Sequence, residues 1–241
     1  VCPCALEDWA WFLFAFALMG RASDVTDYCP DIEDIVIPER GSRDWPEGEE
    51  RPDYIEVVFW WWKARHPSKR NIPYKMRLWR NALNSTFCPV FWVLLHLGLQ
   101  GKRSGPIFCR HPNKTKPRSA KDMAAGIHVD AARPAAFQNM FMTMCEHAAK
   151  RNPALLECTS HSIRRSACQW AAFCGAPTHI IRLVGRWRTA LGAMLRYIRD
   201  GSQAARDEGE ISRQPGVPPM EEVWIFRQNV FGQPGEVQSA L

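Results

Sequence analysis

The chain has 241 residues, of which 46% are hydrophobic and 23% are charged, and its formal net charge is +6. These values are typical of one large globular domain or two small ones, and they exclude a mainly disordered, collagen-like or coiled-coil chain. The longest strongly apolar run, residues 9–19, is shorter than the ~20 residues that a membrane-spanning helix needs, so we expect a buried helix and no membrane contact. Without an initiator Met or a basic-then-apolar leader, the chain is expected to be a fragment of a longer intracellular protein.

The first half of the chain predicts two helices and a small sheet. Residues 6–19 form an apolar helix, and residues 21–28 form a short helix with Ser23 or Asp24 as its N-cap. Strands are predicted from β-branched and aromatic content at three places, which are residues 34–37, 55–62 and 71–76. They are expected to pair as an antiparallel sheet of about three strands with a basic tip.

The second half predicts helices separated by glycine and proline. They are expected at residues 91–99, 130–150, 160–174, 177–184 and 189–199, with Gly98 and Gly101 ending the first of them. The last is expected to turn Leu191, Leu195 and Ile198 inward. The predicted fold class is therefore α+β and mainly α-helical, with one domain over residues 1–200 and an acidic, Gly- and Pro-containing tail over residues 201–241.

Charge is distributed very unevenly along the chain. Residues 57–121 carry 14 Lys and Arg and no acid, whereas residues 1–56 carry 14 acids and 4 Lys and Arg. Such a run predicts a surface for a polyanion, with nucleic acid the obvious partner, although a basic surface without a partner is the alternative. The candidate DNA contacts, there and in the later basic segments, are Arg65, Lys69, Arg70, Lys102, Arg103, Arg165 and Arg186.

Cofactor chemistry has little support in the sequence. The nine cysteines are scattered without paired CxxC units, which favours reduced thiols over a metal site, and a Cys/His metal protein is a distant alternative. No Gly-rich phosphate loop occurs. We therefore expect neither a cofactor nor a metal.

His161-Ser-Ile-Arg164 is the most informative motif. A histidine and an arginine three residues apart at a helix start can face one point, where a guanidinium fork suits phosphate oxygens and an imidazole can exchange a proton. The same spacing also fits a helix-cap histidine beside a surface arginine. Arg165 competes with Arg164 as the anion ligand if the register differs by one residue.

The order of motifs resembles the tyrosine recombinase (phage integrase) family, which includes Cre recombinase and the crypton-type recombinases of mobile elements. His161-Ser-Ile-Arg164 is similar to the family's HxxR box, and Gly185-Arg-Trp187 to its His-or-Trp motif. Tyr197, in Leu-Arg-Tyr-Ile-Arg, stands where the family has its nucleophile. Arg21, in Met-Gly-Arg-Ala-Ser-Asp, matches the first-arginine box, and the basic hairpin at residues 55–76 stands where the family has its catalytic lysine. The likeness covers about residues 8–200.

This resemblance implies the family's catalytic fold and site-specific DNA recombination or integration without metal. Tyr197 would attack a phosphodiester to give a 3′-phosphotyrosine, and His161 would accept its proton. Arg21, Arg164 and Trp187 would bind the phosphate oxygens, and Lys63 or alternatively Lys69 would protonate the departing 5′-oxygen. The partners implied are double-stranded DNA and further copies of the chain in a dimeric or tetrameric synapse. An N-terminal core-binding domain is expected outside this fragment, and the protein is expected where DNA is, in the nucleus if eukaryotic.

One departure from the family pattern keeps other functions open. The interval from Trp187 to Tyr197 is slightly longer than is usual in the family. An inactive, DNA-binding relic of a mobile element is therefore one alternative. A type IB topoisomerase, which uses a similar Arg, Lys, Arg, His, Tyr set to relax DNA, is the other.

Overall fold

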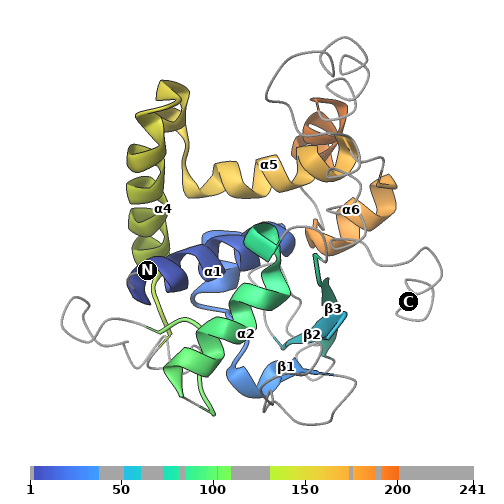
Figure 1. The fold of residues 1–241 in the computed structure, drawn as a ribbon. Helices are drawn as coiled ribbons and strands as arrows, with labels where there is room; N and C mark the ends of the chain where they lie inside the picture. The colour runs from blue at the N-terminus through green and yellow to red at the C-terminus, as the bar shows by residue number, and fades with distance from the viewer. Residues whose placement is uncertain are drawn as a thin grey trace, which may run out of the picture.

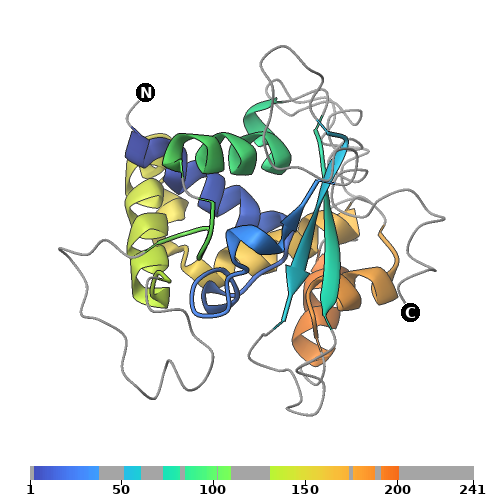
Figure 2. The ribbon, with the colours of Figure 1, turned by 90° about the horizontal axis from the view of Figure 1, so that it is seen from below.

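The structure is a computed structural model that describes residues 3–37, 52–60, 73–81, 85–101, 103–109, 131–173, 176–187 and 191–200. It confirms the predicted class, since these described residues are mixed α+β, mostly helical, with one three-stranded antiparallel sheet. Most of the helices lie on one side of the sheet, and the helices coloured orange lie at its other side (Figure 1, Figure 2). The predicted tail and the tip of the basic hairpin lie outside the described residues.

Five α-helices and a further helical segment make up most of the part of the chain that the structure describes. They are α1 (Pro3–Ala17), α2 (Pro89–Gln100), α4 (Pro134–Ala149), α5 (Ser160–Phe173), α6 (Thr178–Val184) and the segment 191–200. Short 3-10 helices join them: η1 (Ala22–Val25), η2 (Ile32–Asp34), η4 (Ser85–Phe87) and η5 (Pro153–Glu157). None of the helices in these described ranges is long and apolar enough to cross a membrane.

Helix α1 is the central element of the core. It packs against α2 and α5, between which it lies in Figure 1. Its sequence is apolar nearly all round, as expected for a helix buried on several sides, and Trp11 stacks on Phe108 with ring centroids 5.2 Å apart. The Trp11 indole N–H donates to the carbonyl of Val25, so α1 also fixes the segment that follows Arg21.

The sheet has the order β1-β2-β3, with β1 (Ile35–Val36), β2 (Tyr54–Phe59) and β3 (Tyr74–Trp79). In its register, Val57 lies opposite Ile35 on one side and Met76 on the other. All three residues are buried, so this face packs on the core. The predicted strands are confirmed as elements, although β3 runs later than residues 71–76 because its inward residues include Leu78.

Three local predictions are wrong. Gly98 does not end helix α2, which continues to Gln100, whereas Gly101 caps it as predicted, with the left-handed φ of 61° that favours glycine. Residues 22–25 form only a 3-10 turn, and Arg21 rather than Ser23 or Asp24 is its N-cap. In the segment 191–200, Leu195 is exposed and Met194 is buried, because the inward stripe passes through Leu191, Met194, Tyr197 and Ile198.

Candidate functional site

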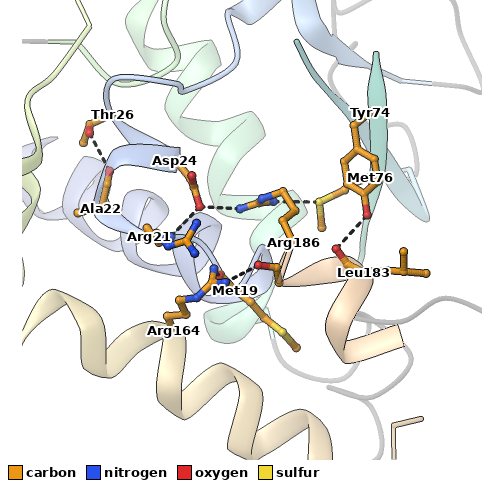
Figure 3. Close-up of polar contacts among 11 residues, drawn as sticks. Met19, Arg21, Ala22, Asp24, Thr26, Tyr74, Met76, Arg164, Leu183 and Arg186 are labelled. Atoms are coloured by element: carbon orange, nitrogen blue, oxygen red, sulfur yellow. Dashed lines mark hydrogen bonds and ion pairs between the residues drawn. The ribbon is translucent and has the colours of Figure 1, made fainter. Parts of the chain in front are cut away.

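Five of the six predicted catalytic residues lie together where four parts of the chain meet. Arg21 follows the end of α1, and His161 and Arg164 are in the first turns of α5. Trp187 follows α6, and Tyr197 is in the segment 191–200. Figure 3 shows the arginine side chains of this region around the end of α1. Lys63, the sixth residue, and its alternative Lys69 lie outside the described residues.

Arg164 lies at the centre of the site and is almost completely buried. Its two terminal nitrogens donate to main-chain carbonyls, Nη1 to Met19 and Nη2 to Gly185. Its guanidinium carbon lies 3.9 Å from the centroid of the Trp187 ring, a cation–π contact. Arg164 therefore joins α5 to the end of α1 and to the turn after α6. In this structure it binds the protein's own backbone, where the sequence predicts a phosphate clamp.

Asp24 and Arg186 form a second, fully buried contact. Arg186 Nη2 lies 3.0 Å from Asp24 Oδ2, and the same oxygen accepts from the backbone N–H of Arg21 at 3.0 Å. Burial by itself would raise the pKa of Asp24, but Arg186 and this N–H outweigh it and hold the pKa below 3.8. The pair therefore contributes stability above that pH, which is lost as the pH falls through the lowered pKa.

This placement corrects the prediction that Arg186 contacts DNA. Its side chain is only 2% exposed, and it also approaches Met76 Sδ at 3.3 Å and the Phe59 ring centroid at 5.0 Å. The sheet and Asp24 enclose the guanidinium, so it presents no surface to a duplex. Of the other candidate DNA contacts, Arg103 and Arg165 are exposed, and Arg65, Lys69, Arg70 and Lys102 lie outside the described residues.

Two strained backbone positions border the site. Met19 and Arg186 have φ values of 46° and 53°, and they are the non-glycine residues with positive φ in the described part of the chain. Side chains there crowd the backbone, which costs on the order of 1–3 kcal/mol. Met19 supplies a carbonyl to Arg164, and Arg186 supplies the guanidinium to Asp24. The strain thus coincides with the contacts that hold the arginines.

The site contains more positive than negative charge. Arg21, Arg164 and Arg186, which we call the arginine cluster, lie near Asp24, the one fully buried acid among the described residues. Burial, and then the charges of Arg21 and Arg186, lower the pKa of Arg164 to about 9. Arg21 Nη1 is buried without a hydrogen-bond partner. A bound anion would relieve this excess charge.

His161 and Tyr197 form a hydrogen-bonded pair at the edge of the cluster. His161 Nε2 lies 3.1 Å from the Tyr197 hydroxyl, and the two rings meet edge to face. The guanidinium carbon of Arg165 lies 5.8 Å from the centroid of the Tyr197 ring. The longer interval after Trp187 therefore does not keep Tyr197 away from His161.

We expect His161 to titrate below the ordinary histidine pKa of 6.5. Its partial burial lowers the pKa first, and the positive charges of Arg164, Arg21 and Arg165 lower it further. At neutral pH the ring is then uncharged and can accept a proton from Tyr197. A titration of the histidine ring resonances by NMR measures this directly. A His161 midpoint at or above 6.5 would mean that the arginines do not act on this ring.

Trp187 packs flat against Gly185 under the guanidinium of Arg164. A Cβ atom on Gly185 would lie 1.7 Å from Trp187 Cζ3, so only glycine fits beneath the ring. The tryptophan is 5% exposed. In the structure its observed role is to cover Arg164, whereas the sequence predicts an indole donor to phosphate.

Gly185→Ala is therefore expected to lower the free energy of unfolding by roughly 1–3 kcal/mol or more, because the ring is pinned by Arg164 and cannot move freely. Urea unfolding followed by circular dichroism measures the change. Gly192→Ala is the matched control, since a Cβ there meets nothing within 4 Å in an exposed helical position and should raise stability by about 0.5–1 kcal/mol. Equal stability of the two variants would contradict this packing.

The sequence analysis does not identify three residues of the site in the roles that the structure shows. Asp24 enters only as a helix cap, and the carbonyls of Met19 and Gly185 carry no side-chain signal at all. The acid three residues after Arg21 could have indicated the hydrogen bond to the Arg21 backbone but not the ion pair with Arg186. In the described part of the chain, no three His, Cys, Asp or Glu residues are grouped as metal ligands.

Comparison with protein-family models and with curated proteins finds no match for this chain. The arrangement of Arg21, Asp24, His161, Arg164 and Tyr197 is therefore the basis for assigning a function.

Proposed function

We propose that this chain is the catalytic domain of a tyrosine-recombinase-type DNA strand transferase, with that family's fold. The observation that carries the proposal is the Tyr197 hydroxyl, which lies 3.1 Å from His161 Nε2 beside an arginine cluster with surplus positive charge. A hydroxyl nucleophile next to a neutral base, with arginines close by to bind the phosphate, suits attack on a phosphodiester.

The proton step uses His161. When the imidazole carries its proton on Nδ1, its Nε2 accepts the hydrogen bond from the phenol. An unperturbed tyrosine has a pKa of about 10, so a base is needed near neutral pH. The lowered pKa of His161 keeps the ring in the accepting form. As the Tyr197 oxygen bonds to phosphorus, its proton passes to Nε2 and the 5′-oxygen of the DNA leaves.

The arginine cluster supplies the electrostatic part of catalysis. Negative charge grows on the nonbridging phosphate oxygens, and fixed cations stabilise it most in a site that excludes water. Arg21 is the best placed, because its buried Nη1 has no partner and its charge acts on both His161 and Arg164. Arg164 contributes its positive charge while it donates hydrogen bonds to the carbonyls of Met19 and Gly185. Lys63 or Lys69 is proposed to protonate the leaving 5′-oxygen.

The remaining parts of the proposal follow from this chemistry. The energy of the broken bond stays in the 3′-phosphotyrosine, so a 5′-hydroxyl from another strand can attack and join without ATP. The partners are double-stranded DNA, bound in part through the basic residues 57–121, and further copies of the chain in a synapse. The protein would act in the compartment that holds DNA.

Covalent trapping tests the proposal and separates it from the alternatives. The protein is incubated with a pool of duplexes of random sequence, each nicked so that cleavage releases a short piece and cannot reverse. A denaturing gel that shows a protein–DNA adduct, together with joined products, supports a recombinase. An adduct with relaxation of supercoiled plasmid but no joining indicates a topoisomerase. Binding without an adduct indicates an inactive relic.

A further inference from the structure

We propose that Arg186 is a positioning residue whose ion pair with Asp24 sets the relative placement of Arg21, Arg164 and Trp187. Its consequence for DNA cleavage rests on the proposed function, but its structural consequence does not. The proposed role of this buried arginine is to position other residues of the site, which differs from the DNA contact expected from the sequence.

The first observation is that one carboxylate oxygen joins two distant segments. Asp24 Oδ2 accepts from the backbone N–H of Arg21 and from Nη2 of Arg186, each at 3.0 Å. Arg186 in turn contacts β3 through Met76 and β2 through Phe59. Figure 3 shows Arg186 reaching from the turn after α6 to Asp24 beside the end of α1. The pair therefore fixes the Arg21 segment relative to the sheet and to the turn after α6.

The second observation is that both chain neighbours of Arg186 bind Arg164. The carbonyl of Gly185 accepts from Arg164 Nη2, and the ring of Trp187 covers the same guanidinium at 3.9 Å. Whatever holds Arg186 in place thus holds two of the contacts of Arg164. The third contact, the carbonyl of Met19, lies two residues before Arg21. One ion pair is connected in this way to every contact of Arg164 described above.

The third observation is that the backbone of Arg186 is strained, with φ at 53°. An arginine does not adopt this conformation without compensation. A buried ion pair in place of apolar side chains adds little net stability, because both charges lose their hydration. The strained backbone and the buried ion pair together add little to the stability of the fold, but they fix the position of Arg186 relative to Asp24.

The test uses a charge-balanced double variant, Asp24→Asn with Arg186→Met, in the full chain. It removes one positive and one negative charge together, so the net charge of the molecule is unchanged. The introduced asparagine keeps an oxygen for the N–H of Arg21, and the introduced methionine meets the same backbone strain as the arginine it replaces. The readout is the NMR titration of His161, whose pKa is lowered first by its partial burial and then by the charges of Arg164, Arg21 and Arg165, and whose hydroxyl partner is Tyr197.

We expect the folded double variant to show the His161 pKa raised toward 6.5, because Arg164 and Arg21 are no longer held beside the ring. Arg186→Lys, which keeps the charge opposite Asp24, should retain most of the lowering. A folded double variant in which His161 titrates as in the wild type would overturn the proposal. If the double variant does not fold, Asp24→Glu decides, since it keeps both charges and moves the carboxylate by one methylene. In Asp24→Glu the proposal requires a His161 pKa above that of the wild type, and an unchanged His161 pKa would refute it.

Cleavage gives a second readout that depends on the proposed function. Displacing catalytic groups by about 1 Å can slow a reaction by roughly 100-fold, so adduct formation by the double variant should fall by that order. The titration needs no DNA. A wild type that never forms an adduct would refute the proposed function and leave the positioning role to be decided by His161 alone.

Discussion

Tyr197→Phe is expected to abolish the covalent protein–DNA adduct while leaving the fold and DNA binding intact. The substitution removes one oxygen, the nucleophile, and phenylalanine offers no substitute for it. The ring itself stays, packed with Ile198 against the buried side chains that include Met194 and Trp187. The hydrogen bond lost with His161 is at an exposed position, so its loss costs little stability.

The assay is the denaturing gel with nicked duplexes, with circular dichroism and salt-dependent DNA binding as measures of integrity. Tyr54→Phe is the matched control, because Tyr54 is on β2 and lies under Arg77, away from the site. It should form the adduct at the wild-type rate. An adduct that persists in Tyr197→Phe would assign the nucleophile to another tyrosine, of which the chain has Tyr28, Tyr54 and Tyr74.

Arg164→Ala has the largest expected effect on stability, a loss of about 3–5 kcal/mol in the free energy of unfolding. The substitution leaves the buried carbonyls of Met19 and Gly185 without their donor and opens a cavity beside Trp187. Slow adduct formation by this variant could therefore result either from the loss of stability or from the loss of the positive charge. Urea unfolding must accompany any activity measurement on it.

Arg165→Ala is the control, since Arg165 is the next residue on α5 after Arg164 and its side chain points outward. Arg165 is 55% exposed and lies 3.6 Å from Asp200, an arrangement worth at most about 1 kcal/mol. The pair of variants also tests which arginine of the motif faces inward. If Arg165→Ala were the more destabilising of the two, the described packing of α5 would be wrong.

The parts of the fold that depend on local sequence patterns could be predicted. The apolar run at residues 9–19 predicted a buried helix, and the β-branched segments predicted the sheet and its antiparallel direction. The spacing of His161 and Arg164 predicted that both face one point at the start of α5, whereas their meeting with Arg21 and Tyr197 was expected from the family resemblance alone. These features depend on a repeat of hydrophobic residues or on the geometry of one helix turn.

The parts that depend on distant contacts could not be predicted. Arg186 reads as one more basic residue, because the sequence does not show that Asp24, 162 positions earlier, faces it across the core. The partners of Arg164 are main-chain carbonyls, which every residue has, so no residue type marks them. Leu195 is as apolar as Met194, and only the packing against α5 and α6 decides which of them turns inward.

The polarity of the covalent link tests the central claim most directly. A nicked duplex is labelled at the 5′-end of the cleaved strand, and the released downstream piece is offered to a polynucleotide kinase. We predict that the 5′-labelled part stays on the protein and that the downstream piece accepts phosphate at a free 5′-hydroxyl, as a 3′-phosphotyrosine requires. A released piece that already carries a 5′-phosphate, or label that never joins the wild-type protein, would contradict attack by Tyr197 on the DNA phosphate.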